Sequence, residues 1–214
     1  MRRKKRPPEK QAAARVPSSI APSPVKVMVA STIYGFQDQL EQIVGVLRGY
    51  GYFVMSSHLG SVRVDPNKSN LDNCKLAVAG CDAFFGIIRP NYGSGVIGDR
   101  SITHEECLQA VTMNKPRWFV VDRNVVVARQ LLKPYMFDHE GRRTDFRLRA
   151  NPILSDLRVI DMYDEVVQRD VAPVNRVGNW VQEYDGAPKI LTYLQHQFED
   201  IDAVRRICAE MKQS

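Results

Sequence analysis

The stretch Asp99–Pro116, D-R-S-I-T-H-E-E-C-L-Q-A-V-T-M-N-K-P, decides how the rest of the chain is arranged. Thr103 is a residue type that caps helix N-termini, and Glu106 follows it at the three-residue spacing of a capping box. A helical face then recurs at steps of three and four, at Cys107, Ala110, Val111 and Asn114. Asn114 suits a left-handed C-terminal cap, and Pro116 cannot continue a helix. The stretch therefore predicts a helix that ends before a buried strand at Trp118–Val121.

A glycine-rich loop, Tyr92–Arg100, precedes this helix and follows another apolar run, Ala83–Ile88. In an open parallel sheet, the loops at the carboxyl ends of the strands line the ligand crevice. We therefore expect the polar and ionisable side chains at the helix start to lie at the rim of such a crevice. These are Ser101, Thr103, His104, Glu105 and Glu106.

Strand and helix patterns alternate between Lys26 and Met136. Apolar runs predict strands at Lys26–Ala30, Tyr52–Met55, Ala83–Ile88 and Trp118–Val121, and amphipathic stretches between them predict helices. Ser69 and Asp72 form a second capping box. This order predicts a doubly wound α/β fold with a parallel sheet.

The pattern is looser after Asp122. A helix is expected at Val125–Met136, stopping near Pro134, and a hairpin or arm at Phe137–Ala150. Asp156–Met162 is the expected fifth strand, Val171–Asp185 is expected to be irregular, and one long amphipathic helix is expected from Lys189. The long helix fits either packing onto the sheet or a coiled-coil seam. The predicted division is a disordered basic tail (1–25), an α/β core (26–136) and an extension (137–214) packed on it.

The arm carries four arginines, which fit either a solvated edge or contact with a phosphate or an acidic partner. They are Arg142, Arg143, Arg147 and Arg149.

The net charge of +6 lies in the tail, because residues 1–25 hold seven basic residues and one acidic residue. The tail is too poor in large apolar residues to fold, and it suits a localisation signal, a phosphate-binding arm or a solubilising segment. The remainder is neutral, so we do not expect the folded part to bind nucleic acid.

The cysteines and histidines favour neither disulfides nor a metal site. Cys74, Cys81, Cys107 and Cys208 lack C-x-x-C spacing, and the four histidines are scattered, so we expect buried thiols and no metal. No apolar run approaches the ~18 residues of a membrane span, and no apolar segment follows the basic start, so we predict a cytoplasmic protein without a membrane partner.

The chain from Lys26 resembles an uncharacterised domain family that occurs alone in prokaryotes and at the front of NACHT/WD-repeat proteins. The resemblance rests on V-M-V-A-S-T-I-Y-G-F-Q-D, V-D-P-N-K-S-N-L-D-N-C, C-D-A-F-F-G-I-I-R-P-N-Y-G-S-G and S-I-T-H-E-E-C-L-Q-A-V-T-M-N-K-P. That family is in turn similar to TIR domains and nucleoside 2-deoxyribosyltransferases. The resemblance implies a flavodoxin-like sheet of about five strands, a role in bacterial immunity or stress signalling, and a site completed in a homo-oligomer.

The deoxyribosyltransferase pattern E-[I/L]-G-x-A-x-x-x-G-K-P is matched in part from Glu106. Ala110, Lys115 and Pro116 stand at the expected spacing, whereas Leu108 and Asn114 stand where the pattern has glycine. The resemblance implies that Glu106 stabilises or traps the cationic sugar formed when an N-glycosidic bond breaks. We expect its helix N-terminus to favour the ionised carboxylate. Helix capping alone, or an ion pair elsewhere, would also explain this glutamate.

Other candidate residues surround this glutamate. Asp99 or His104 would transfer a proton to the leaving base, Ser31, Thr32 and Ser101 would bind sugar or phosphate, and Tyr34 or Tyr92 would stack on the base. Ordinary loop, helix-start and rim-packing roles would also explain them. The predicted function is cleavage of NAD, a nucleoside or a nucleotide, with NAD or the nucleotide as substrate and no cofactor. The alternative is a non-catalytic module that senses a nucleotide or assembles with like domains.

Overall fold

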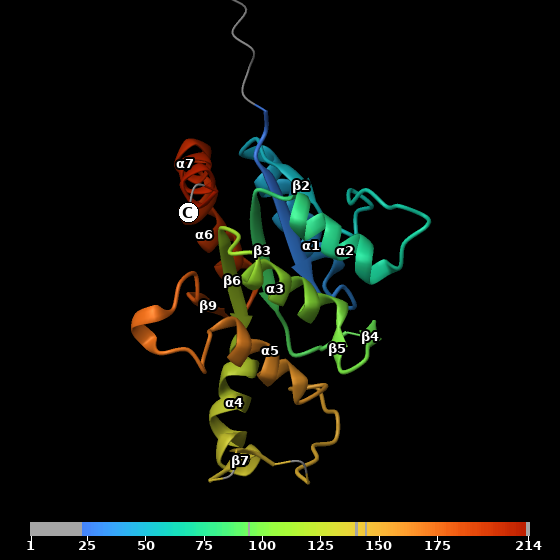
Figure 1. The fold of residues 1–214 in the computed structure, drawn as a ribbon, viewed down its shortest axis with the longest axis vertical. Coiled ribbons are helices and arrows are strands. Elements are labelled where there is room, and N and C mark those ends of the chain that lie inside the picture. The colour runs from blue at the N-terminus through green and yellow to red at the C-terminus, as the bar shows by residue number, and fades with distance from the viewer. Residues whose placement is uncertain (1–22, 94, 140, 144, 213–214) are drawn as a thin grey trace, which may run out of the picture.

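The central feature of the computed structural model is a five-stranded parallel sheet with helices on both faces (Figure 1). The structure describes residues 23–93, 95–139, 141–143 and 145–212, so the predicted tail lies almost entirely outside the described residues. The order β2-β1-β3-β6-β9 is that of a flavodoxin-like fold, which confirms the predicted fold class. The strands of this sheet are β1 (Lys26–Ser31), β2 (Phe53–Met55), β3 (Ala83–Ile88), β6 (Arg117–Asp122) and β9 (Val181–Tyr184).

Seven helices cover the two faces within the described residues. One face packs against α1, α6 and α7, and the other packs against α2, α3, α5 and the first turns of α4. The helices are α1 (Gln37–Gly49), α2 (Asn70–Gly80), α3 (Ile102–Thr112), α4 (Arg123–Met136), α5 (Arg158–Val166), α6 (Ala187–Phe198) and α7 (Ile201–Met211).

Two short hairpins and a 3-10 turn complete the described elements. They are β4 (Val96–Ile97) with β5 (Arg100–Ser101), β7 (Phe137–Asp138) with β8 (Gly141–Arg142), and Pro173–Asn175. The second hairpin confirms the one expected at the start of the arm.

Side chains alternate across the sheet because successive strand residues point to opposite faces. Phe85 and Ile87 of β3 join the core under α1 and α6, whereas Phe84 and Ile88 join the core under α2 and α3. Gly86 lies between them, and a Cβ there would come within 2.5 Å of the Phe119 ring. Glycine at this position therefore allows β3 and β6 to pack side by side.

The expected fifth strand at Asp156–Met162 is wrong, because these residues lead into and form most of α5. The buried side chains Val159, Ile160, Met162 and Val166 follow helical spacing, which a short apolar run does not reveal on its own. The fifth strand is β9, inside the stretch expected to be irregular, and pairing with β6 organises it.

The expected single C-terminal helix is two helices, because Asp200 caps a new one. Its Oδ1 accepts hydrogen bonds from the backbone N–H groups of Asp202 and Ala203, at 3.1 and 2.9 Å. Leu194 and Val204 are buried on opposite sides of this break. Their burial confirms packing back onto the sheet. The helix α4 also runs on through Pro134 to Met136, where a stop was expected.

Candidate functional site

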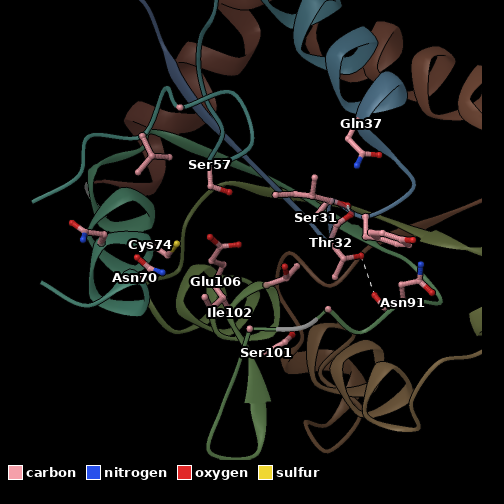
Figure 2. Close-up of a pocket in the computed structure, with 18 of the residues that line it drawn as sticks. Ser31, Thr32, Gln37, Ser57, Asn70, Cys74, Asn91, Ser101, Ile102 and Glu106 are labelled. Atoms are coloured by element: carbon pink, nitrogen blue, oxygen red, sulfur yellow. Dashed lines mark hydrogen bonds between the residues drawn. The ribbon is translucent and has the colours of Figure 1, made fainter. Parts of the chain in front are cut away.

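A cavity of about 860 Å³ opens at the carboxyl ends of β1 and β3, where the loops were expected to form a crevice (Figure 2). Most of its lining comes from four places: residues 31–34 at the end of β1, the loop after β3, the start of α3, and α2 with the segment before it. Gln37 at the start of α1 and Ser155 before α5 complete it. We call it the Glu106 cavity. Five of the eight predicted site residues line it, namely Ser31, Thr32, Tyr34, Ser101 and Glu106.

Glu106 is buried in the second turn of α3 and its carboxylate points into the cavity (Figure 2). Only 4 % of the residue is exposed. The predicted capping box is wrong: the helix begins at Ile102, and the Ser101 side chain accepts the N–H of His104 at 3.2 Å. Thr103 lies inside the helix. Helix capping therefore does not explain Glu106.

The electrostatics of Glu106 are set by burial. Loss of water raises its pKa to about 7, and a hydrogen-bonding interaction with the Cys74 thiol offsets this only in part. Among the described lining residues there is no arginine, lysine or histidine. The helix N-terminus was expected to favour the ionised carboxylate, but burial has the larger effect and favours the protonated form. Burial beside Glu106 also raises the pKa of Cys74 to about 12, so this thiol stays neutral.

The residues after β1 form one wall of the cavity. The Thr32 hydroxyl donates to the Asn91 carbonyl at 2.9 Å, and this bond joins the loops after β1 and β3 (Figure 2). Ser31 donates to the Thr32 carbonyl at 3.1 Å. Tyr34 is 85 % exposed, so its ring is free to cover a bound ligand.

Arg89 holds this wall in place from behind. Its guanidinium donates to the carbonyls of Thr32 and Tyr34 at 2.8 and 2.9 Å, and it lies 4.4 Å above the Phe36 ring. Burial lowers the pKa of Arg89, and both carbonyls accept from Nη1 of its guanidinium. The backbone of the 32–34 segment is therefore preorganised.

His104 and Tyr92 lie behind the cavity and do not line it. Both are only 2 % exposed, and the Tyr92 hydroxyl lies 2.6 Å from His104 Nδ1. His104 Nε2 lies 3.1 Å from Glu165, and burial lowers the pKa of this imidazole. A neutral ring then donates from Nε2 to the carboxylate and accepts the tyrosine proton at Nδ1. The tyrosine oxygen accepts the Ser101 N–H at 3.2 Å.

This burial removes two predicted roles. The Tyr92 ring cannot stack on a base, and the His104 nitrogens are engaged away from the cavity. Asp99 is exposed and also lies outside the lining, and its carbonyl accepts from Arg158 at 3.1 Å. The geometry thus leaves Glu106 as the one carboxylate among the described lining residues.

Comparison with family models matches residues 26–171 to a domain of unknown function, DUF4062. The chain belongs to the DUF4062 family. Every described residue that lines the Glu106 cavity falls between positions 31 and 155, so the cavity is a feature of the DUF4062 region. The strand β9 and the helices α6 and α7 follow this region. A comparison with curated proteins gave no match.

Sequence reasoning missed several polar residues of the DUF4062 cavity. Asn91 follows β3 at the same sheet edge as Ser31, so its position was predictable. The others come from loops and helices without such a signal: Gln37, Ser57, Asn70, Asn73, Cys74 and Ser155.

Asn73 is buried and fixes the loop before α2. Its amide nitrogen donates to the carbonyls of Asp65 and Ser69, both at 3.1 Å, and its oxygen accepts the Asp65 N–H at 2.8 Å. This side chain therefore positions the part of the wall that the loop supplies.

Neither a metal site nor a membrane span is found in the part of the chain that the structure describes. No group of three or more histidine, cysteine or acidic side chains there is arranged to hold a metal ion. No described helix has the length and apolar character to cross a bilayer. All four cysteines are buried as free thiols, as expected.

Proposed function

We propose that this chain is an enzyme that cleaves the N-glycosidic bond of a nucleoside or nucleotide, NAD included, with Glu106 as the acting carboxylate. One observation carries the proposal: a buried carboxylate faces a ligand-sized cavity whose described lining holds no cationic side chain. A buried anion without such a partner lowers the stability of the fold, and ionisable groups kept at this cost cluster at functional sites.

The reaction needs an anion because breaking the bond leaves positive charge on the anomeric carbon. The bond between that carbon and the base nitrogen breaks, and the electron pair leaves with the base. Glu106 stabilises the sugar cation by charge, or forms an ester bond to the anomeric carbon that water later hydrolyses. Water supplies the hydroxyl group of the sugar product. Its remaining proton goes to the departing base of a neutral nucleoside or nucleotide, and to solvent when the substrate is NAD, whose nicotinamide leaves as a neutral molecule.

The low-polarity surroundings strengthen this effect. A carboxylate in a water-poor cavity attracts a developing cation much more than a carboxylate in bulk water does. With a pKa of about 7, Glu106 is ionised in about half of the molecules at neutral pH. A cationic sugar beside it favours the ionised form further.

The surrounding groups suit a nucleoside. Ser31, Thr32 and Ser101 supply hydroxyl groups to the same cavity as the Glu106 carboxylate, and Tyr34, also in its lining, is exposed. We propose that the hydroxyls orient the ribose and that Tyr34 covers the base. Arg89 and the Tyr92–His104 pair act as positioning groups behind this surface.

The test is product analysis with matched variants. Wild type, Glu106→Gln and Glu105→Gln are each incubated with NAD and a panel of nucleosides and nucleotides, and released bases are separated by chromatography. Glu105 is the control because it is a neighbouring acid paired with Lys75 at 3.0 Å. We expect base release by wild type and Glu105→Gln and a loss of at least about a hundredfold in Glu106→Gln.

Two outcomes contradict the proposal. Equal activity of wild type and Glu106→Gln would remove the carboxylate from the mechanism. Ligand binding without turnover by wild type, measured over a concentration range in which light scattering follows self-association, would favour the nucleotide-sensing alternative. A role in defence or stress signalling remains a prediction that rests on the resemblance, and action in the cytoplasm remains a prediction from the sequence.

A further inference from the structure

A second cavity, of about 640 Å³, lies beside the Glu106 cavity along the outer edge of β2. Its lining comes from the edge strand, from the loop before α2 and from α2 itself, with Lys26 at the start of β1. Val64 and Asn73 line both cavities, so the two cavities are adjacent. We call it the Arg63 cavity.

The charges of the two cavities are opposite. The described lining of the Glu106 cavity has a carboxylate and no cationic side chain, whereas Arg63 and Lys26 line the Arg63 cavity. Arg63 is exposed, and among the described residues its guanidinium has no hydrogen bond or ion pair. The cavity also holds Asp65, but that carboxylate is engaged by Lys68 at 3.6 Å and by the Asn67 N–H at 2.9 Å. The Arg63 guanidinium therefore remains available to an anion, whereas the charge of Lys26 also acts on the Asp82 carboxylate.

The Arg63 cavity also offers apolar surface. Phe53 is 48 % exposed and Leu76 is 51 % exposed, and both line it. Lys26 begins β1 whereas Ser31 ends it, and five steps of a strand span about 16 Å. Arg63 and Val64 are adjacent in sequence, so Arg63 is at the near end of the groove and Lys26 at the far end.

We infer that the Arg63 cavity binds the phosphate of a nucleotide whose glycosidic bond lies against Glu106. This inference rests on the proposed function and narrows its substrate class from nucleosides to phosphorylated N-glycosides. Arg63 pairs with the phosphate nearest the reacting sugar, because a guanidinium binds phosphate oxygens through charge-assisted hydrogen bonds. Lys26 and Phe53 are reached only by a longer ligand, such as a dinucleotide with a pyrophosphate and a second base.

The experiment measures binding to the full chain carrying Glu106→Gln, so that no ligand is consumed. Adenosine, AMP and NAD are titrated by calorimetry into this variant and into the same variant carrying Arg63→Gln, Lys26→Gln or Arg206→Gln. Arg206 is the matched control, an exposed arginine on α7 away from both cavities. We expect Arg63→Gln to weaken the binding of AMP and of NAD by about tenfold and to leave the affinity for adenosine unchanged. Lys26→Gln should weaken the binding of NAD alone if the site takes a dinucleotide. It should change the binding of neither AMP nor NAD if the site takes a mononucleotide.

The results that overturn the inference are distinct from those that overturn the proposed function. Equal affinities with Arg63→Gln and Arg206→Gln, or an equal loss for adenosine and AMP with Arg63→Gln, would remove the phosphate site while leaving Glu106 chemistry intact. Failure of all three probes to bind would also overturn it. Glu106-dependent base release from unphosphorylated nucleosides alone would preserve the enzyme and exclude this substrate class.

Discussion

The Ser101 side-chain oxygen accepts the backbone N–H of His104 at 3.2 Å, and this single hydrogen bond caps α3. Because Ser101 takes this role, the helix begins one residue before Thr103 and Glu106 falls in its second turn. The carboxylate is then directed to the cavity and away from the helix end. Had Thr103 been the cap, Glu106 would have served the helix start. Because the cap lies two residues earlier, at Ser101, the Glu106 carboxylate is available to the cavity.

Substitutions at the cap test this geometry. Ser101→Ala should lower the free energy of unfolding by about 1 kcal/mol because an N–H at the helix start loses its acceptor. Thr103→Val, which keeps the side-chain shape, should change it by less than about 0.5 kcal/mol. Urea denaturation monitored by circular dichroism measures both. A larger loss of unfolding free energy for Thr103→Val than for Ser101→Ala would contradict the Ser101 cap and favour Thr103 as the capping residue.

The two tyrosines predicted to stack on a base should behave differently. Tyr92→Phe removes the hydroxyl that bonds both His104 and the Ser101 N–H, and we expect a loss of about 2 kcal/mol in unfolding free energy. Tyr34→Phe removes an exposed hydroxyl and should be neutral within about 0.5 kcal/mol. Equal stabilities of the two variants in urea would show that the buried network contributes nothing.

The α/β core was predictable because its signals are local. The apolar run Ala83–Ile88 indicates a buried strand, and Asn114 and Pro116 indicate where α3 ends. Asn114 has the positive φ of 47° expected of a left-handed cap. The last sheet strand was not predictable in this way. The four residues Val181–Tyr184 become a strand through pairing with β6, which lies some sixty positions earlier.

The candidate site divides in the same manner. Ser31, Thr32 and Ser101 were found because strand ends and helix starts meet at one sheet edge. His104 was misplaced because its partner, Glu165, comes from α5, where a strand was expected, and Tyr92 was misplaced because it bonds His104. The Cys74 thiol has no sequence signal, since only the packing of α2 against α3 brings it to Glu106, and the Asn73 amide has none because its partners lie in an irregular loop.

Activity should depend on pH through Glu106. Its pKa is raised to about 7, and the ionised form is the one that stabilises a cationic sugar. Below that value kcat/KM should therefore fall about tenfold for each pH unit, and above it kcat/KM should level off. Base release measured from pH 5 to 8.5 gives this profile. A flat profile would mean that no carboxyl group with this pKa takes part.

The Asn73 amide should control the order of the loop before α2, which contributes to both cavities. Asn73→Ala removes its bonds to Asp65 and Ser69, and we expect a loss of about 2 kcal/mol and faster amide exchange at Asp65. Asn70→Ala is the control because Asn70 lines the Glu106 cavity at the start of α2 and is exposed. Hydrogen exchange followed by mass spectrometry measures the effect. Unchanged exchange in the 61–69 segment would contradict this role.

The pH dependence of stability tests the burial of Glu106 without any substrate. In the folded state its pKa is raised from 4.5 to about 7, so between these values the folded chain binds more protons than the unfolded chain. The contribution of Glu106 to the free energy of unfolding therefore falls as pH rises through this window and is constant above it. The shift corresponds to a loss on the order of 3 kcal/mol, since one pKa unit is about 1.4 kcal/mol.

Glu106→Gln should abolish this part of the pH dependence. The glutamine keeps the side-chain shape and carries no charge. The free energy of unfolding of the variant should therefore rise relative to that of wild type as pH rises from 5 to 8. Urea denaturation of both chains at pH 5 and pH 8 isolates the Glu106 contribution, because all other titrating groups are shared. The difference between the two chains should change by on the order of 3 kcal/mol over this range. A difference that stays constant would mean that this carboxyl group titrates as it does in water, and would remove the electrostatic basis for its role in catalysis.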